Sequence, residues 1–206
     1  MEPLKAKDAD RILSEHLGAK LVAEGFEAVI ARKWVRSTRA PIREVFQINA
    51  MKGASFAPAW GISLDFVPHL SGASIKTHRT TKGAVFDLSY DPVDYATDVN
   101  SWCADTFQAA SEFAVAVDRV AEKALPLAKS FWAETATIDG LLKAFEAKRT
   151  RPFVRFGLDN YPQQSLAFAF VLARAGKLEE ARERLHQLAL PEGCAEALLA
   201  RLNNPE

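Results

Sequence analysis

The chain has 206 residues, of which 49% are hydrophobic and 25% are charged, and its formal net charge is zero. This composition is typical of a folded globular protein with a substantial core. A balanced charge does not favour general attraction to nucleic acid or to an anionic membrane. No stretch reaches the roughly 18 uninterrupted apolar residues of a membrane span. We therefore expect neither a nucleic acid nor a membrane as partner.

The two cysteines and the first ten residues indicate the cellular compartment of the protein. Cys103 and Cys194 show no metal-binding or redox spacing, and a chain with this much apolar material needs no disulfide. Residues 1–10 carry charges where a signal peptide would carry its apolar segment. These features predict a cytoplasmic protein with reduced thiols.

Alternating patterns predict strands in the first half of the chain. The clearest is Trp60–Leu70, where Trp60, Ile62, Leu64 and Phe66 alternate with polar or small residues. A helix is expected over 6–25, where apolar residues recur every three or four positions. Because the strands are separated by loops, not helices, we expect an antiparallel sheet. The expected strands are 26–35, 42–50, 60–66 and 83–89.

The second half of the chain reads as helical. Alanines and larger apolar residues recur from about Asp98 to Glu134, which predicts a long helix that breaks or kinks near Pro126. Further helices are expected over 138–148, 162–175, 178–188 and 191–202. The predicted fold class is α+β: an antiparallel sheet of four to five strands covered by the N-terminal helix and the long central helix. The predicted domains are an α+β domain over 1–135 and a helical subdomain over 136–206.

The sequence offers little that indicates catalysis. The sequence contains no Gly-rich phosphate loop, no nucleophile elbow and no paired cysteine motif, so we expect no cofactor. Asp65 lies on the polar face of the third expected strand, and His69 and His78 flank the loop after it. A folded-back loop would bring the three together as a metal site or an acid–base pair. The alternative is that all three are solvated surface groups.

Charge is unevenly distributed along the chain. Residues 32–82 contain nine Lys or Arg against Glu44 and Asp65, whereas residues 87–118 contain seven acidic residues and no basic ones. One interpretation is a charged recognition surface for an anionic partner; the other is that the two halves neutralise each other. A basic hairpin without aromatic platforms or overall positive charge does not favour nucleic acid. The basic binding residues in the first interpretation are Arg32, Lys33, Arg36, Arg39 and Arg43.

Three short stretches resemble a bacterial family of domains of unknown function. They are Leu21-Val-Ala-Glu-Gly-Phe26 at a helix exit, Val45-Phe-Gln-Ile-Asn49, and Trp60-Gly-Ile-Ser-Leu64. The resemblance covers residues 10–135 and implies an α+β fold, without catalytic residues to carry over. Small bacterial families of this kind are similar to toxin-neutralising immunity proteins, although a fold does not fix a function.

Together these features favour a non-enzymatic protein-binding module, of immunity-like type, that uses a charged sheet edge and loops. Two alternatives stay open. One is a small-molecule hydrolase or metal-dependent enzyme that uses Asp65, His69 and His78 on the polar face of the third strand. The other is a scaffold whose alanine-rich helix stripe joins subunits.

Overall fold

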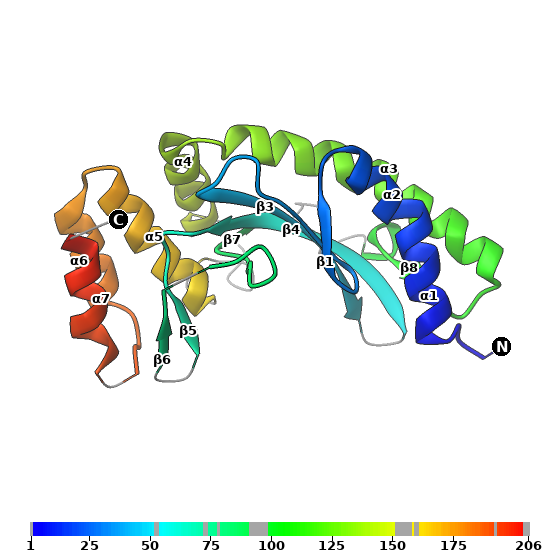
Figure 1. The fold of residues 1–206 in the computed structure, drawn as a ribbon, viewed down its shortest axis with the longest axis horizontal. Helices are drawn as coiled ribbons and strands as arrows, with labels where there is room; N and C mark the ends of the chain where they lie inside the picture. Colours follow the sequence, from blue (N-terminus) through cyan, green and yellow to red (C-terminus); the bar gives the residue numbers. More distant parts are fainter. Residues whose placement is uncertain are drawn as a thin grey trace.

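A computed structural model of the chain describes residues 2–51, 54–71, 74–77, 79–90, 99–150, 158, 161–191 and 193–203. It has the predicted α+β fold class, with an antiparallel sheet, an N-terminal helix, a long central helix and a C-terminal group of helices (Figure 1). None of the described helices is long and apolar enough to cross a membrane. Both cysteines are free thiols.

Within the described residues, the sheet has six strands and all its strand pairs are antiparallel. The short β8 (Ala104–Asp105) pairs with the start of β4, and β5 (His69–Ser71) with β6 (Ser74–Lys76) forms a separate hairpin. The main order is β1 (Glu27–Ile30), β2 (Lys33–Arg36), β3 (Ile42–Met51), β4 (Ser55–Leu64) and β7 (Leu88–Tyr90). β4 is therefore an inner strand, between β3 on one side and β7 and β8 on the other, and β1 is an edge strand.

The helices cover one face of this sheet and lie at both of its ends. Figure 1 shows the long α3 (Ala110–Glu134) above the sheet, with the C-terminal helices gathered at one end and the N-terminal helix at the other. The N-terminal helix consists of α1 (Ala6–Leu13), a π-helical turn η1 (Ser14–Gly18) and α2 (Ala19–Ala23). The remaining helices are η3 (Val99–Trp102), α4 (Ile138–Arg149), α5 (Pro162–Arg174), α6 (Leu178–His186) and α7 (Cys194–Asn203).

The core lies between β4 and α3, as the alternation in the sequence predicts. Trp60, Ile62 and Leu64 are fully buried on this face. The Trp60 ring stacks on Tyr90 of β7 with the ring centroids 5.2 Å apart. Trp132 of α3 donates its indole N–H to the Gly61 carbonyl at 3.0 Å. Apolar burial and this aromatic packing together fix α3 on the sheet.

The first expected strand, 26–35, is two strands. The chain reverses between β1 and β2, and Arg32 has a φ of 62° in this turn. A left-handed backbone is ordinarily supplied by Gly or Asn. The turn here contains Ala31 and Arg32, so the usual turn residues that would reveal it in the sequence are missing.

The third and fourth expected strands have different limits in the structure. β4 begins at Ser55, inside the expected loop, and ends at Leu64; residues 69–71 belong to the separate β5. Pro58 is tolerated inside β4 because it lies between the part paired with β8 and the part paired with β7. The expected strand over 83–89 pairs only as β7, because the preceding residues fold over the sheet instead of pairing with it.

The long helix is shorter at its start than predicted and is not broken at its proline. α3 begins at Ala110, not near Asp98, and the Glu112 carboxylate accepts a hydrogen bond from the Ala109 N–H at 3.0 Å. Pro126 lies inside a continuous helix. Full burial of Ala124 and Ala128 on either side of it stabilises the helix against the loss of one backbone hydrogen bond.

Candidate functional site

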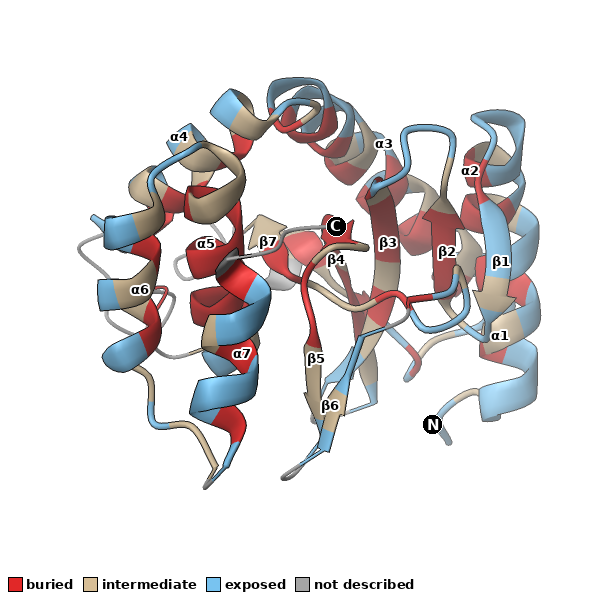
Figure 2. Ribbon diagram, turned by 60° about the vertical axis from the view of Figure 1, so that its left-hand side comes forward, coloured by how far each residue is buried: buried red, intermediate tan, exposed pale blue. Residues whose placement is uncertain are grey.

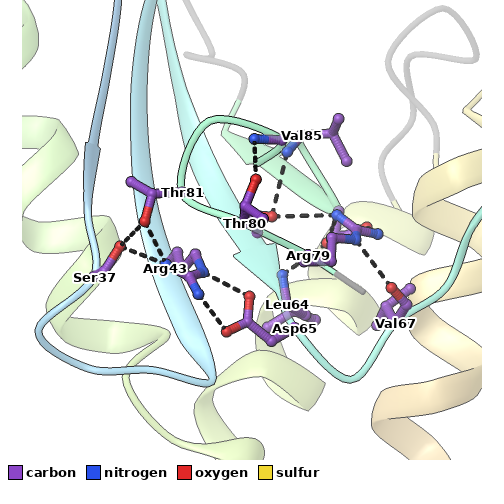
Figure 3. A network of polar contacts seen from close by, with 12 residues as sticks. Ser37, Arg43, Leu64, Asp65, Val67, Arg79, Thr80, Thr81 and Val85 are labelled. Carbon is purple, nitrogen blue, oxygen red and sulfur yellow. Dashed lines mark hydrogen bonds and ion pairs between the residues drawn. The ribbon is translucent and has the colours of Figure 1, made fainter. Parts of the chain in front are cut away.

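The sequence points to the polar face of β4, and the structure covers this face with the segment 79–87. Ser63, which alternates with the core residues of β4, is fully buried there. Its hydroxyl lies 3.2 Å from Arg79 Nη1 and 3.3 Å from the Val85 N–H. Figure 3 shows Arg79 and Val85 together with the neighbouring Arg43 cluster.

Asp65 is bound to an arginine. Because Arg43 on β3 pairs with Ser63 on β4, its side chain lies beside the end of β4. Arg43 Nε is 2.6 Å from Asp65 Oδ1, and Nη2 is 2.8 Å from Oδ2 (Figure 3). The remaining Arg43 nitrogen donates to Ser37 Oγ and Thr81 Oγ1 at 2.7 and 2.9 Å. This bidentate geometry occupies both carboxylate oxygens and joins three segments of the chain.

A second bidentate pair, between Arg79 and Asp87, is buried more deeply. Arg79 Nη1 is 2.8 Å from Asp87 Oδ2, and Nη2 is 2.9 Å from Oδ1. The Leu64 N–H and the Gln163 side chain complete the hydrogen bonding of the carboxylate at 2.7 Å each. Gln163 comes from α5, so this pair ties the C-terminal helices to the sheet.

The buried charges near this pair have shifted pKa values. Burial raises the pKa of the Asp87 carboxyl, while Arg79 and the surrounding hydrogen bonds oppose the rise. Burial and the neighbouring Arg79 charge lower the pKa of Lys33. Lys33 donates its ammonium hydrogen to the Ala84 carbonyl. All these groups have partners, which is the arrangement of a structural network.

The structure shows no contact between the expected acid–base residues that it describes. His69 lies in β5, opposite Lys76, and its buried Nδ1 has no hydrogen-bond partner among the residues that the structure describes. Asp65 is held by Arg43, and His78 lies outside the described residues. Among the described residues, no group of three or more His, Cys, Asp or Glu side chains could hold a metal ion.

The five basic residues proposed for recognition all contact neighbours in this chain. Arg32 bonds to Asp10 on α1 and lies over the Phe56 ring, 4.3 Å from its centroid. Lys33 and Arg43 are engaged as described above. Arg36 and Arg39 both face Glu44, whose side chain is almost fully buried; Arg39 Nη1 is 3.4 Å from its Oε1.

In the acidic segment 87–118, the described residue Asp118 also has partners in this chain. Asp118 on α3 accepts hydrogen bonds from His16 at 2.8 Å and from Lys20 at 2.6 Å. These two hydrogen bonds, that of Lys20 first, hold the pKa of Asp118 below its ordinary value. Among the described residues, the basic residues of the hairpin therefore pair with acids outside the segment 87–118. Arg79, in the following loop, pairs with Asp87 of that segment.

One edge of the sheet is open at β1. Within the described residues, β1 pairs only with β2, so the outer edge of its backbone has no strand partner. Its side chains are exposed except for the half-buried Val29, and Ile30 is 53% exposed. Figure 2 shows β1 in the exposed colour beside the largely buried β2 and β3.

A hollow of about 290 Å³ lies between β1 and the first helix. Its walls include Leu13 and Ser14 on one side and Ala28, Ile30 and Trp34 on the other. We call this hollow together with the outer edge of β1 the β1 surface. Sequence reasoning missed it because the turn that separates β1 from β2 has no glycine or asparagine.

A second hollow, of about 490 Å³, lies on the first turns of α3. It includes Ser111, Glu112 and Val115, and Val115 is 70% exposed. It is formed by α3 and the residue Gln108 before it, and it adjoins no free strand edge. The β1 surface therefore offers more kinds of contact, since it combines backbone groups with an apolar hollow.

Comparison with known proteins gives no match: no family model, no curated protein and no solved structure is similar to this chain. The functional argument therefore rests on the residues described above. The family resemblance of the three short stretches stays a prediction.

Proposed function

We propose that this chain is a protein-binding module that binds its partner at the β1 surface. The observation that carries the proposal is the exposed, apolar edge strand next to a hollow. Exposed sheet edges are reactive toward other chains, and natural proteins usually cover or guard them. A surface of this kind is maintained where a partner uses it.

The contacts of the polar residues favour binding over catalysis. A general base needs an available lone pair and a proton to accept, within hydrogen-bond reach. Both oxygens of Asp65 are already engaged by Arg43. The hydrogen bonds of Arg79 and Asp87 are directed at each other, at the backbone, and at the Ser63 and Gln163 side chains. These residues therefore serve to hold loop and sheet together.

The recognition surface differs from the basic cluster expected from sequence. Arg36, Arg39 and Arg43 are engaged by Glu44 and Asp65, so an anionic partner would have to replace intramolecular ion pairs. The β1 surface requires no such exchange. An immunity-like role is one form of this proposal, in which the partner is a toxin encoded beside the gene for this chain.

The proposal can be tested with a photo-activated cross-linking residue placed at Ile30 in the full chain. A matched probe at Val115 is also exposed but lies on α3, outside the β1 surface. We expect one discrete cross-linked protein from position 30 that position 115 does not give. With that protein purified, Ile30→Asp should weaken its binding at least about tenfold, a loss of about 1.4 kcal/mol.

Two results would count against binding at this surface. One is the same cross-linking pattern from both positions, and the other is a purified partner whose affinity is unchanged by Ile30→Asp. Val115→Asp serves as the control for adding a carboxylate to an exposed apolar position.

A further inference from the structure

We infer that the partner of the β1 surface is an extended segment of another protein, which adds as a new strand to the outer edge of β1. This inference rests on the proposed function and names the chemistry of its partner. The outer edge of β1 presents backbone N–H and C=O groups that lack a strand partner among the described residues. Another extended backbone satisfies such groups better than a helix, whose own backbone groups bond internally.

The edge has only part of the protection of natural edge strands, since it is four residues long and carries a bulge. β1 contains neither proline nor lysine, and Glu27 is its one charged residue. Its one irregularity is a bulge between Ala28 and Ile30. The bulge twists the strand locally but leaves the outer backbone groups uncovered.

The hollow determines which kind of side chain is favoured at one position of the added strand. Ala28 pairs with Trp34, whose ring lies close enough to the first helix that a Cβ on Gly18 would be 3.2 Å from it. Ala28 therefore faces the hollow, and a partner residue opposite Ala28 faces it too. The two charged groups of the hollow, Asp10 and Arg32, bond to each other. Because they neutralise each other, the hollow favours an aliphatic side chain.

Glu27, the residue next to Ala28, determines which side chain is favoured at the neighbouring position of the partner strand. Glu27 pairs with Val35 and so lies on the opposite face of the sheet from Ala28. It is exposed and has no hydrogen bond or ion pair among the described residues. A partner residue opposite Glu27 is favoured when it is Lys or Arg, because opposite charges across strands attract. The segment should therefore carry an aliphatic residue directly beside a basic one.

A displayed library of random peptides, selected on the immobilised full chain, tests this. The selection is run in parallel on wild type, Glu27→Lys, Ala28→Glu and, as control, Val115→Lys. All three changed side chains are exposed, so the variants should fold, and circular dichroism with thermal unfolding checks that they do.

We expect wild type and Val115→Lys to enrich peptides with an aliphatic residue next to Lys or Arg. Glu27→Lys should shift that neighbour to Asp or Glu. Ala28→Glu should lower binding of the wild-type peptides by about tenfold, which corresponds to about 1.4 kcal/mol. With the best peptide bound, amide exchange should slow in β1.

Strand addition is overturned if no peptide is enriched above the empty support. It is also overturned if the enriched peptides are indifferent to both β1 substitutions or leave β1 amide exchange unchanged. Those results leave the proposed function separately measurable, because a folded partner would still cross-link at position 30. Loss of that cross-link would instead remove the proposed function.

Discussion

Arg79 and Asp87 form a bidentate ion pair in which both side chains are almost completely removed from solvent. Arg79 also donates to the Val67 carbonyl at 3.0 Å, and Asp87 accepts from Gln163 of α5. The pair thus joins β4, the covering loop and the C-terminal helices. The pair is compatible with a stable fold because both charges are present, since a buried charge without its partner is strongly destabilising.

Removing one member of the pair should destabilise the fold severely. Asp87→Ala leaves the Arg79 guanidinium buried without its counter-charge, and we expect a loss of about 3–5 kcal/mol in the free energy of unfolding. Urea unfolding measures it. The double substitution Arg79→Met with Asp87→Leu should be less destabilised than Asp87→Ala alone. A loss below about 1 kcal/mol for the single substitution would show that water reaches the site.

Gly61 should be intolerant of even one added methyl group. An alanine Cβ there would lie 2.2 Å from the Leu88 carbonyl oxygen, so β7 would have to move away from β4. We expect Gly61→Ala to lower the free energy of unfolding by about 1–3 kcal/mol, the usual cost of overpacking. Gly83→Ala is the control, because its nearest neighbour is the Thr80 hydroxyl at 3.2 Å, a side chain that can rotate. Equal losses for both substitutions would contradict the steric argument.

The fold was more predictable from the sequence than the site. Alternation placed Trp60, Ile62 and Leu64 on the core face, because period-two patterning reports directly which face is buried. The helices from Ile138 onward were equally clear from their spacing and from Gly176 as a stop. The turn at Arg32 was missed, since a left-handed arginine leaves no local signal.

Contacts between residues distant in sequence are harder to predict. The partners of the basic residues come from separated segments, as Asp10 does for Arg32, and no periodicity records such contacts. The sequence also suggested that Ser63 and Asp65 formed an open polar face. The segment 79–87 covers Ser63, and only its tertiary path reveals this.

His69 offers a test of the alternative catalytic interpretation. Among the described residues its Nδ1 is buried without a hydrogen-bond partner, which costs free energy, and such a cost is retained where the group has a function. If His69 is only structural, His69→Leu should leave the free energy of unfolding within about 1 kcal/mol of the wild-type value. Chemical denaturation measures this. Marked stabilisation would favour a retained functional role, whereas a loss above about 2 kcal/mol would reveal a partner for the ring.

Asp118 links the first helix to α3, and its contribution to stability should depend on pH. Hydrogen bonds from Lys20 and His16 lower the pKa of its carboxyl in the folded state. A group with a lowered folded pKa stabilises above its unfolded pKa, about 3.9, and loses that contribution as the pH falls through the folded value. Because the side chain is 37% exposed, solvent screening limits the effect.

We therefore expect Asp118→Asn to lower the free energy of unfolding by less than about 1 kcal/mol at pH 7. The difference from wild type should shrink below about pH 4, where the carboxylates become protonated. It should also shrink in about 1 M salt, which screens exposed charges. Glu122→Gln is the matched control, since Glu122 is exposed on the same helix and has no polar contact among the described residues. A difference that stays constant from neutral to acidic pH would show that packing, not charge, accounts for the effect of Asp118.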